Sequence, residues 1–298
     1  MRHLPDPVCL GVVGVVNRTY TSKRPLVGKS KLTTRDKGGI GKDLSDGYTI
    51  NMAIGCLHGC PFCYVDEIIE KFHKARHGIT EPWGEYLIVR EGIRDLAAST
   101  NWEKYRGKEI LMSSTHDPYL PCLQGGTREI LRHALPHGVK FRIQTRQIGF
   151  LGEEDLFKAY PDQVQVQVSV CTWHEALRRI VEPRILPTQD RLRALRAIEG
   201  VRKGVIMAPL VPACEVRCAA PFDIIQVAKS IKFHVPDVDH VYGEVLHVRG
   251  DNLERMNHLL GVKMTRASLK KWDEDAEGVF YAVMGDLNID ATFWREHR

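Results

Sequence analysis

Strand and helix patterns alternate along most of this chain. Strand-like segments, rich in alternating or continuous apolar residues, occur at 47–54, 109–114, 139–145, 163–170, 203–210 and 240–248. Helical patterns follow them, at 65–77, 124–135, 153–160, 188–199, 221–233 and 251–260. Six repeats of a strand followed by a helix predict an α/β fold, built on a parallel sheet with right-handed crossovers.

Two of these segments carry polar side chains along one whole face. In 163–170, valines alternate with three glutamines and Ser169. In 139–145, arginine and glutamine alternate with phenylalanine and isoleucine, and Arg146 continues the polar face. Successive side chains of a strand point to opposite faces, whereas a strand in an ordinary parallel sheet is apolar on both. A curved sheet with a polar interior explains both segments; an edge strand with one face in solvent is the alternative.

The chain is expected to have three parts. Its 298 residues, 43% of them apolar, are enough for one large core. We predict an N-terminal extension at 1–45, a strand–helix region at 46–262, and a C-terminal extension at 263–298. The last part carries five aromatic residues and is expected to pack back on the core: Trp272, Phe280, Tyr281, Phe293 and Trp294.

Targeting signals are not evident. No apolar run approaches the roughly 18 residues that predict a membrane helix. The first residues lack a small-residue cleavage site of the kind that ends a signal peptide. We therefore expect a cytoplasmic protein with no membrane partner.

Positive charge is concentrated near the N-terminus. Between residues 18 and 42 lie eight basic residues and one acidic residue, Asp36: Arg18, Lys23, Arg24, Lys29, Lys31, Arg35, Lys37 and Lys42. Mixed with Gly, Ser and Thr, this stretch is typical of a basic arm. It is either a solvated leader without a partner or a segment that binds phosphate groups or nucleic acid.

The loop after the first strand, "GCLHGCPFCY" (55–64), concentrates Cys56, Cys60 and Cys63. Thiolates bind zinc or iron–sulfur clusters. A structural zinc site is normally closed by four ligands, but no second cysteine pair lies near, and His58 would strain the loop as a ligand. A cubane cluster held by three cysteines leaves one iron without a protein ligand. Catalytic metal sites keep such an open position.

The other five cysteines do not suggest a disulfide framework, because the chain is long and has no export signal. Cys214 and Cys218 repeat a Cys-x-x-x-Cys spacing after the fifth strand. They would bind a second metal with outside help, form a redox pair, or have no chemical role.

The spacing of the three clustered cysteines resembles that of the radical S-adenosylmethionine (SAM) enzymes. Within them, the loop is similar to the spore photoproduct lyase-like (DNA repair photolyase) branch, G-C-x-H-x-C-x-Y-C-Y. The similarity continues in family order through five segments: 113–121, 143–147, 166–170, 181–195 and 204–212. It implies a partial (β/α)6 TIM-type barrel, here with an N-terminal basic arm and a C-terminal extension.

The resemblance also implies roles for individual residues. Cys56, Cys60 and Cys63 would hold a [4Fe–4S] cluster whose open iron binds SAM. Three groups of residues would contact the cofactor: Phe62 and Tyr64 beside the adenine, Arg146 and Ser169 on the polar strand faces, and Ser114. Ser114 stands where the lyase has the cysteine that returns hydrogen to the substrate. A serine O–H bond is too strong for that step, so spore photoproduct repair is not the first expectation.

Further candidates lie near predicted strand ends, where barrel active sites form. His116 and Tyr242 are the candidates on the substrate side. Cys122 is the first candidate hydrogen donor and Cys171, after the Ser169 strand, is the second, although a lone cysteine is more commonly a small packing residue. Asp117, before a proline, is also typical of a turn. Arg184 and Arg191 would bind a carboxylate or phosphate, or serve at the surface or a helix end.

Three functions remain open. In the first, reductive cleavage of SAM gives a 5′-deoxyadenosyl radical that abstracts hydrogen from a nucleobase, a nucleotide or nucleic acid. In the second, the same chemistry makes or rearranges a bond in a small metabolite. In the third, the chain is a non-catalytic metal-binding module. The first two require a reducing partner, similar to flavodoxin or ferredoxin.

Overall fold

The computed structural model describes residues 16–30, 44–212 and 220–295. The chain divides into two compact units. The first unit contains the described parts of Met1–Leu57, Phe72–Val166 and Ile198–Val201, and the second contains those of His58–Lys71, Gln167–Ala197 and Arg202–Arg298. Cys214, Cys218 and most of the basic arm lie outside the described residues.

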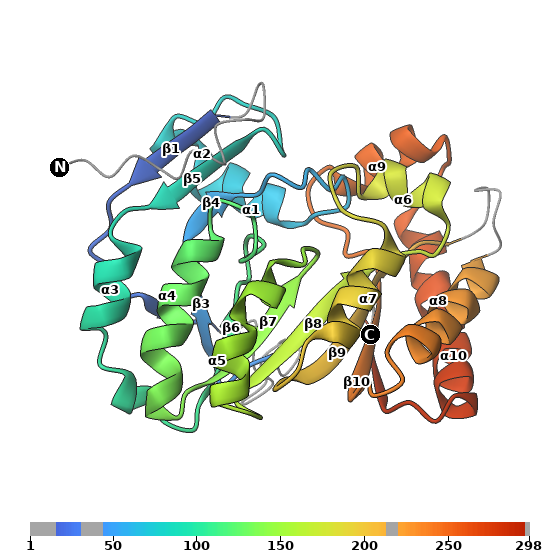
Figure 1. The fold of residues 1–298 in the computed structure, drawn as a ribbon. Helices are drawn as coiled ribbons and strands as arrows, with labels where there is room; N and C mark the ends of the chain where they lie inside the picture. Colours follow the sequence, from blue (N-terminus) through green and yellow to red (C-terminus); the bar gives the residue numbers. More distant parts are fainter. Residues whose placement is uncertain (1–15, 31–43, 213–219, 296–298) are drawn as a thin grey trace. The chain divides into compact units, whose positions relative to one another are not determined.

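A small three-stranded sheet belongs to the first unit (Figure 1). Strand β5 (Tyr86–Arg90) lies at its centre, parallel to β1 (Val16–Tyr20) and antiparallel to β4 (Ala53–Gly55). The buried Arg90 guanidinium donates to backbone carbonyls of the segment after β1, including that of Pro25 at 3.2 Å. A buried arginine needs such partners, so these bonds fix the path of that segment.

A second set of strands in the first unit is mostly parallel. β2 (Val27–Lys29) is antiparallel to β3 (Tyr48–Ile50), which runs parallel to β6 (Glu109–Met112); β6 runs parallel to β7 (Lys140–Thr145). Helices α3 (Ile93–Ser99) and α4 (Gln124–Ala134) lie side by side in Figure 1. The first unit also contains α2 (Lys74–His77) and α5 (Glu154–Ala159).

Strand β8 (Val164–Val170) begins in the first unit and continues into the second. In the second unit, β10 (His240–Val245) lies between β9 (Arg202–Leu210) and β11 (Ala291–Trp294), parallel to both. The helices of this region are α1 (Val65–Phe72), α6 (Glu175–Val181), α7 (Thr188–Ala197), α8 (Ala220–His234), α9 (Asn252–Leu260) and α10 (Arg266–Asp286).

The C-terminal helix α10 packs against α8 and β10 (Figure 1). It begins at a capping box in which Thr265 and Ser268 each accept the other's backbone N–H. Phe280 is fully buried and faces Gly243 of β10, where an added Cβ would lie 2.8 Å from the ring. Gly243 therefore makes room for the aromatic side chains that the C-terminal residues bring to the core.

The predicted α/β class with a mostly parallel sheet is confirmed. Within the described residues, the strand order ends at β2 in the first unit and at β11 in the second, so neither unit closes on itself. The segment 47–54 forms two short strands rather than one, and 65–77 forms two helices. Strands β1, β2, β5 and β11 and helices α3, α6 and α10 were not predicted. The domain boundaries at 45/46 and 262/263 stay predictions.

The polar face of β8 is buried, and that of β7 is partly buried. All seven residues of β8 are buried, with Gln165 at 3% and Gln167 at 0% exposure, so the alternative of an exposed edge strand is wrong. On β7, Arg142 pairs with Glu109 at 2.8 Å. These side chains point into protein rather than into bulk solvent. Among the described residues, no helix is long and apolar enough to cross a lipid bilayer.

Candidate functional site

The cysteine loop connects the end of β4 to the start of α1. Cys56 and Cys60 are buried, at 7% and 5% exposure, and Cys63 is half-buried. The backbone N–H of Cys63 donates to the carbonyl of Cys60 at 3.1 Å, which closes a turn. This turn belongs to the second unit, while Cys56 follows β4 in the first.

Two glycines of the loop adopt backbone angles that other residues avoid. Gly55 has φ 92° and Gly59 has φ 64°. At Gly55, an added Cβ would lie 2.7 Å from the ring and the carbonyl oxygen of Tyr86. The sequence therefore needs glycine at the point where the chain leaves β4 and starts the loop.

Helix α9 contacts the backbone of the cysteine turn. The Asn252 Nδ2 donates to the Phe62 carbonyl at 2.9 Å, and the Arg255 Nε donates to the Pro61 carbonyl at 3.2 Å. Arg255 Nη1 also lies 2.7 Å from Asp66 Oδ2, in the first turn of α1. The segment between Cys60 and Cys63 is thereby attached to α9.

The donor chemistry of the loop fits an iron–sulfur cluster. Among the described residues, no three His, Cys, Asp or Glu side chains converge as ligands of a single metal ion. Three thiolates are a donor set that a cubane cluster takes, one thiolate to each of three irons.

The two aromatic residues of the loop have different surroundings. Phe62 is partly buried and packs against the apolar core of the second unit, which includes Met256 and Leu246. Tyr64 is partly exposed, and its ring centroid lies 6.4 Å from that of His247. Desolvation of its hydroxyl, with a smaller effect of the nearby Cys63 thiol, raises the pKa of Tyr64 to about 12, so the phenol is protonated. Their predicted contacts with adenine stay predictions.

Ser114 is fixed by a side chain of the neighbouring strand segment. The Asn51 Oδ1 accepts from the Ser114 backbone N–H at 3.0 Å, and the Asn51 Nδ2 donates to the Ser114 Oγ at 3.0 Å. These bonds hold Ser114, two residues past β6, against Asn51, the residue that follows β3. The structure thus gives Ser114 a local positioning contact, and its predicted contact with SAM stays a prediction.

His116 is buried and neutral. Its Nε2 accepts from the Met52 backbone N–H at 3.3 Å, so in the neutral ring Nδ1 carries the proton, 3.0 Å from Ser113 Oγ. Burial lowers the pKa of His116 to about 3. In this arrangement the neutral imidazole joins two segments of the first unit, and at neutral pH it carries no positive charge and does not serve as a general acid.

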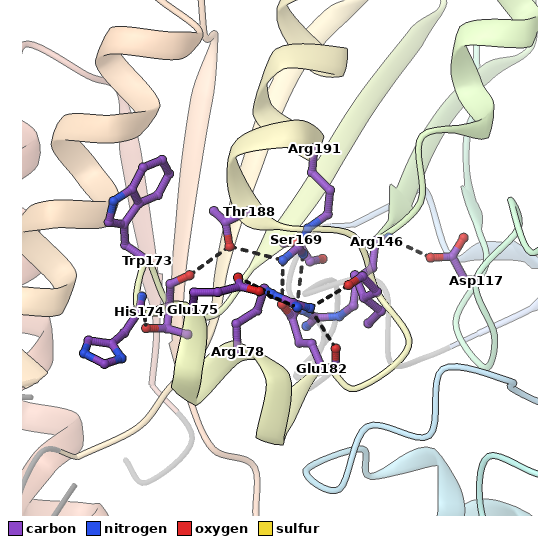
Figure 2. Close-up of polar contacts among 12 residues, drawn as sticks. Asp117, Arg146, Ser169, Trp173, His174, Glu175, Arg178, Glu182, Thr188 and Arg191 are labelled. Atoms are coloured by element: carbon purple, nitrogen blue, oxygen red, sulfur yellow. Dashed lines mark hydrogen bonds and ion pairs between the residues drawn. The ribbon is translucent and has the colours of Figure 1, made fainter. Parts of the chain in front are cut away.

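Asp117 joins the ends of β6 and β7. Its carboxylate accepts from the Thr145 hydroxyl at 2.8 Å and from the Arg146 backbone N–H at 2.6 Å; Figure 2 shows the contact with Arg146. The Tyr119 backbone N–H donates to it at 2.9 Å. The predicted turn at Asp117 is therefore present, and the carboxylate also fixes the backbone where Arg146 leaves the strand.

At the end of β8, Arg191 binds the Ser169 carbonyl and pairs with Glu182 (Figure 2). Neither side chain of the Arg191–Glu182 pair is exposed. Arg191 is therefore a structural residue of the second unit, and the interpretation of it as a ligand for a substrate phosphate or carboxylate is wrong. Arg184 is exposed.

The remaining candidates lie apart from these contacts. Tyr242 stacks on Trp294 of β11, with ring centroids 4.4 Å apart and 22° between the planes. It lies in the middle of β10 rather than at its end. Cys122 is half-buried in the turn that precedes α4. Their catalytic roles stay predictions.

Several residues of this region were missed from sequence. Asn252 and Arg255 reach loop residues that are 190 and 194 positions away, and Asn51 reaches Ser114 across 63 positions. Asn252 lies near a helix start, where asparagine is commonly a cap. That local signal would have suggested a different role.

Comparisons with known proteins identify a family and two sequence relatives. The model of the radical SAM superfamily matches residues 50–213. The ORF301 protein of Acidianus two-tailed virus is 42% identical over 281 residues, which cover 93% of this chain and 92% of that protein. The MJ0683 protein of Methanocaldococcus jannaschii is 26% identical over 206 residues, 68% of this chain and 71% of that protein.

Solved structures of spore photoproduct lyase share the fold. A mutant with bound AdoMet and dinucleoside spore photoproduct has a TM-score of 0.66 and 12% identity, covering 94% of this chain and 82% of that one. A lyase complex with the dinucleoside spore photoproduct has a TM-score of 0.64 and 13% identity, covering 93% and 82%. With the superfamily model matching over half of its residues, this chain belongs to the radical SAM superfamily and has the fold of spore photoproduct lyase.

Proposed function

We propose that this radical SAM enzyme abstracts hydrogen from a nucleobase or nucleotide, free or within nucleic acid. The observation that carries the proposal is the lyase fold, which extends over 94% of the chain and, in that solved structure, holds a dinucleoside. The family membership supports the radical chemistry, and the likeness of fold supports the proposed class of substrate.

The superfamily's cofactors are a [4Fe–4S] cluster and SAM, and we assign Cys56, Cys60 and Cys63 as the cluster ligands. When bound, these groups supply a 5′-deoxyadenosyl radical by reductive cleavage of SAM, with an electron from a flavodoxin- or ferredoxin-like partner. Arg146 and Ser169 are proposed to bind SAM, because Ser169 lies on the polar face of β8 and Arg146 directly follows β7.

The substrate is proposed to differ from the spore photoproduct itself. Ser114 stands where the lyase has its hydrogen-returning cysteine, and its hydroxyl is hydrogen-bonded to Asn51. An O–H bond is too strong to give hydrogen to a carbon radical readily. The substrate radical must therefore be quenched by another group, for which Cys122 is the candidate, or by loss of an electron.

Exposed positive charge in the first unit supports an anionic partner. Lys23, Arg24 and Lys29 are exposed in the described part of the basic arm. Each lysine or arginine that neutralises a phosphate releases a counterion, which makes binding weaker at higher salt. Replacing these three residues by Gln is expected to lower both oligonucleotide affinity and its salt dependence. The matched control replaces three exposed lysines near the C-terminus, Lys263, Lys270 and Lys271.

Isotope transfer tests the substrate class directly. Reconstituted, reduced protein is incubated with SAM and with deuterated nucleosides, nucleotides or oligonucleotides. We expect deuterium to appear in 5′-deoxyadenosine with at least one of these. SAM cleavage with no deuterium from any of them would contradict the proposal and favour a small-metabolite substrate. A protein that binds iron but never cleaves SAM would instead be a metal-binding module.

A further inference from the structure

We propose that Asn252 and Arg255 of α9 are positioning residues that hold the Cys60–Cys63 turn in the shape that binds the cluster. The proposal rests on the assignment of Cys60 and Cys63 as cluster ligands. It extends that assignment by giving a role in cluster binding to two residues outside the three-cysteine motif. All of the contacts involved lie within the second unit.

Asn252 is fully buried and uses every polar atom of its side chain. Its Nδ2 donates to the Phe62 carbonyl at 2.9 Å and to the His247 carbonyl at 2.7 Å. Its Oδ1 accepts from the Arg249 backbone N–H at 3.1 Å. A buried amide that lost one of these partners would carry an unsatisfied polar group, so the three bonds hold its orientation. The cysteine turn is thereby joined to the segment that follows β10.

Arg255 holds the cysteine turn at a second point, the residue before Phe62. Its Nε donates to the Pro61 carbonyl at 3.2 Å, while its Nη1 lies 2.7 Å from Asp66 Oδ2. The carbonyls of Pro61 and Phe62 therefore both accept hydrogen bonds from α9. These two carbonyls belong to the peptide planes on either side of Phe62. Fixing both planes fixes the backbone that leads directly into Cys63.

Helix capping does not account for Asn252. The residue before it, Asp251, is the N-cap of α9, and it makes no side-chain capping hydrogen bond. Asn252 itself directs its two N–H donors to carbonyls outside α9, one of which lies 190 residues earlier in the chain. Asn252 therefore connects the cysteine turn to the segment that follows β10.

Another asparagine on the same helix provides a matched control. Asn257 also makes two side-chain bonds to backbone atoms, donating to the Met264 carbonyl and accepting from its N–H, each at 2.8 Å. The Asn257 side chain is half-buried. It holds the segment after α9 and does not contact the cysteine turn in these bonds. Asn252→Ala and Asn257→Ala thus remove the same amide group. Only the first substitution removes a hydrogen bond to the cysteine turn.

The first measurement is hydrogen exchange of the full-length, metal-free protein. Asn252→Ala and Arg255→Met should speed the exchange of amides in residues 60–66 roughly five- to thirtyfold, which corresponds to the loss of one or two hydrogen bonds. Asn257→Ala should leave that segment at the wild-type rate. Equal rates in Asn252→Ala and Asn257→Ala, or no protection of the segment in the wild type, would overturn the proposal.

The second measurement follows iron in the reconstituted protein. Asn252→Ala and Arg255→Met should lose iron to a chelator at least fivefold faster than wild type and Asn257→Ala. Arg255→Lys, which keeps a positive charge near Asp66, should fall between Arg255→Met and wild type. Should Asn252→Ala fail to fold, the two Arg255 variants test the same claim. Faster hydrogen exchange with an unchanged rate of iron loss would show that Asn252 and Arg255 hold the turn but do not affect cluster binding, which would overturn the proposal. A wild-type protein that binds no iron would instead overturn the assignment of the cysteines as ligands.

Discussion

Arg191 and Glu182 form an ion pair in which neither side chain has any exposed surface. The Arg191 Nη2 lies 2.5 Å from Glu182 Oε2, and the same guanidinium donates to the Ser169 carbonyl at the end of β8. Thr188, at the start of α7, accepts a further bond from it at 3.3 Å. A charge buried in this way depends on its partner, because removing one member leaves the other unpaired in protein.

Stability should therefore fall sharply when this pair is broken. We expect Arg191→Met to lower the free energy of unfolding by about 3–5 kcal/mol, as measured by denaturant titration. Arg193→Met, on the same helix but with a 60% exposed side chain paired with Asp190, should change it by less than about 1 kcal/mol. Equal decreases in the free energy of unfolding would show that the buried ion pair stabilises the fold no more than the exposed one does.

The buried His116 should make stability depend on pH. Its pKa is about 3 in the folded protein and 6.5 as the ordinary value, so the unfolded chain binds more protons between these limits. The free energy of unfolding should decrease as pH falls from 6.5 toward 3, and His116 should contribute no slope above that window. Urea titrations at several pH values should show a smaller slope for His116→Gln. An unchanged slope would mean that the imidazole titrates normally.

Iron content should follow the three clustered cysteines. Anaerobically reconstituted wild-type protein is expected to carry about four irons per chain. Replacing Cys56, Cys60 and Cys63 together by Ala should remove the iron, whereas Cys171→Ala, in the buried core of the second unit, should retain it. The Cys214→Ala/Cys218→Ala variant should also keep about four irons. Loss of a separate portion of iron from it would reveal a second metal site.

SAM affinity should report the two proposed cofactor contacts. Ser169→Ala and Arg146→Leu delete a polar group without adding bulk, and each should weaken SAM binding roughly ten- to a hundredfold, as expected for a lost hydrogen bond to a charged group. Equilibrium binding to reconstituted protein, at equal iron content, provides the measurement. Unchanged affinity in both variants would place SAM elsewhere.

Product analysis should decide the role of Cys122. This half-buried cysteine lies in a turn, so Cys122→Ala should change stability by no more than about 1 kcal/mol. SAM cleavage should continue. We expect the same product at the same rate, because lone cysteines are usually packing residues. A shift to adducts while 5′-deoxyadenosine still forms would identify Cys122 as the hydrogen donor.

Local patterns predicted the parts of the fold whose signal is contained in a short segment. The six strands and the cysteine loop were found because apolar periodicity and thiol spacing are local properties. The break in segment 47–54 was not found, because it depends on distant partners. The Met52 backbone binds both His116 and the N–H of Arg90, which draws the chain from one sheet into the other.

In the candidate site, too, the features contained in a short segment were predicted and those that depend on distant residues were not. The thiols of Cys60 and Cys63 were evident from spacing, whereas the attachment of their turn to Asn252 depends on tertiary packing. The failed interpretation of Arg191 has a related cause. An arginine beside a family motif has the same local sequence whether it faces a ligand or a buried glutamate such as Glu182.

The bond from Asn252 to Phe62 also sets an order of events during synthesis. The two residues are 190 positions apart, so the ribosome completes the cysteine loop well before it reaches α9. At about 5–20 residues per second, the interval is roughly 10 to 40 s. During this time the nascent loop lacks the two hydrogen bonds that α9 later gives its backbone. A cluster delivered to the finished chain meets a loop that is already held.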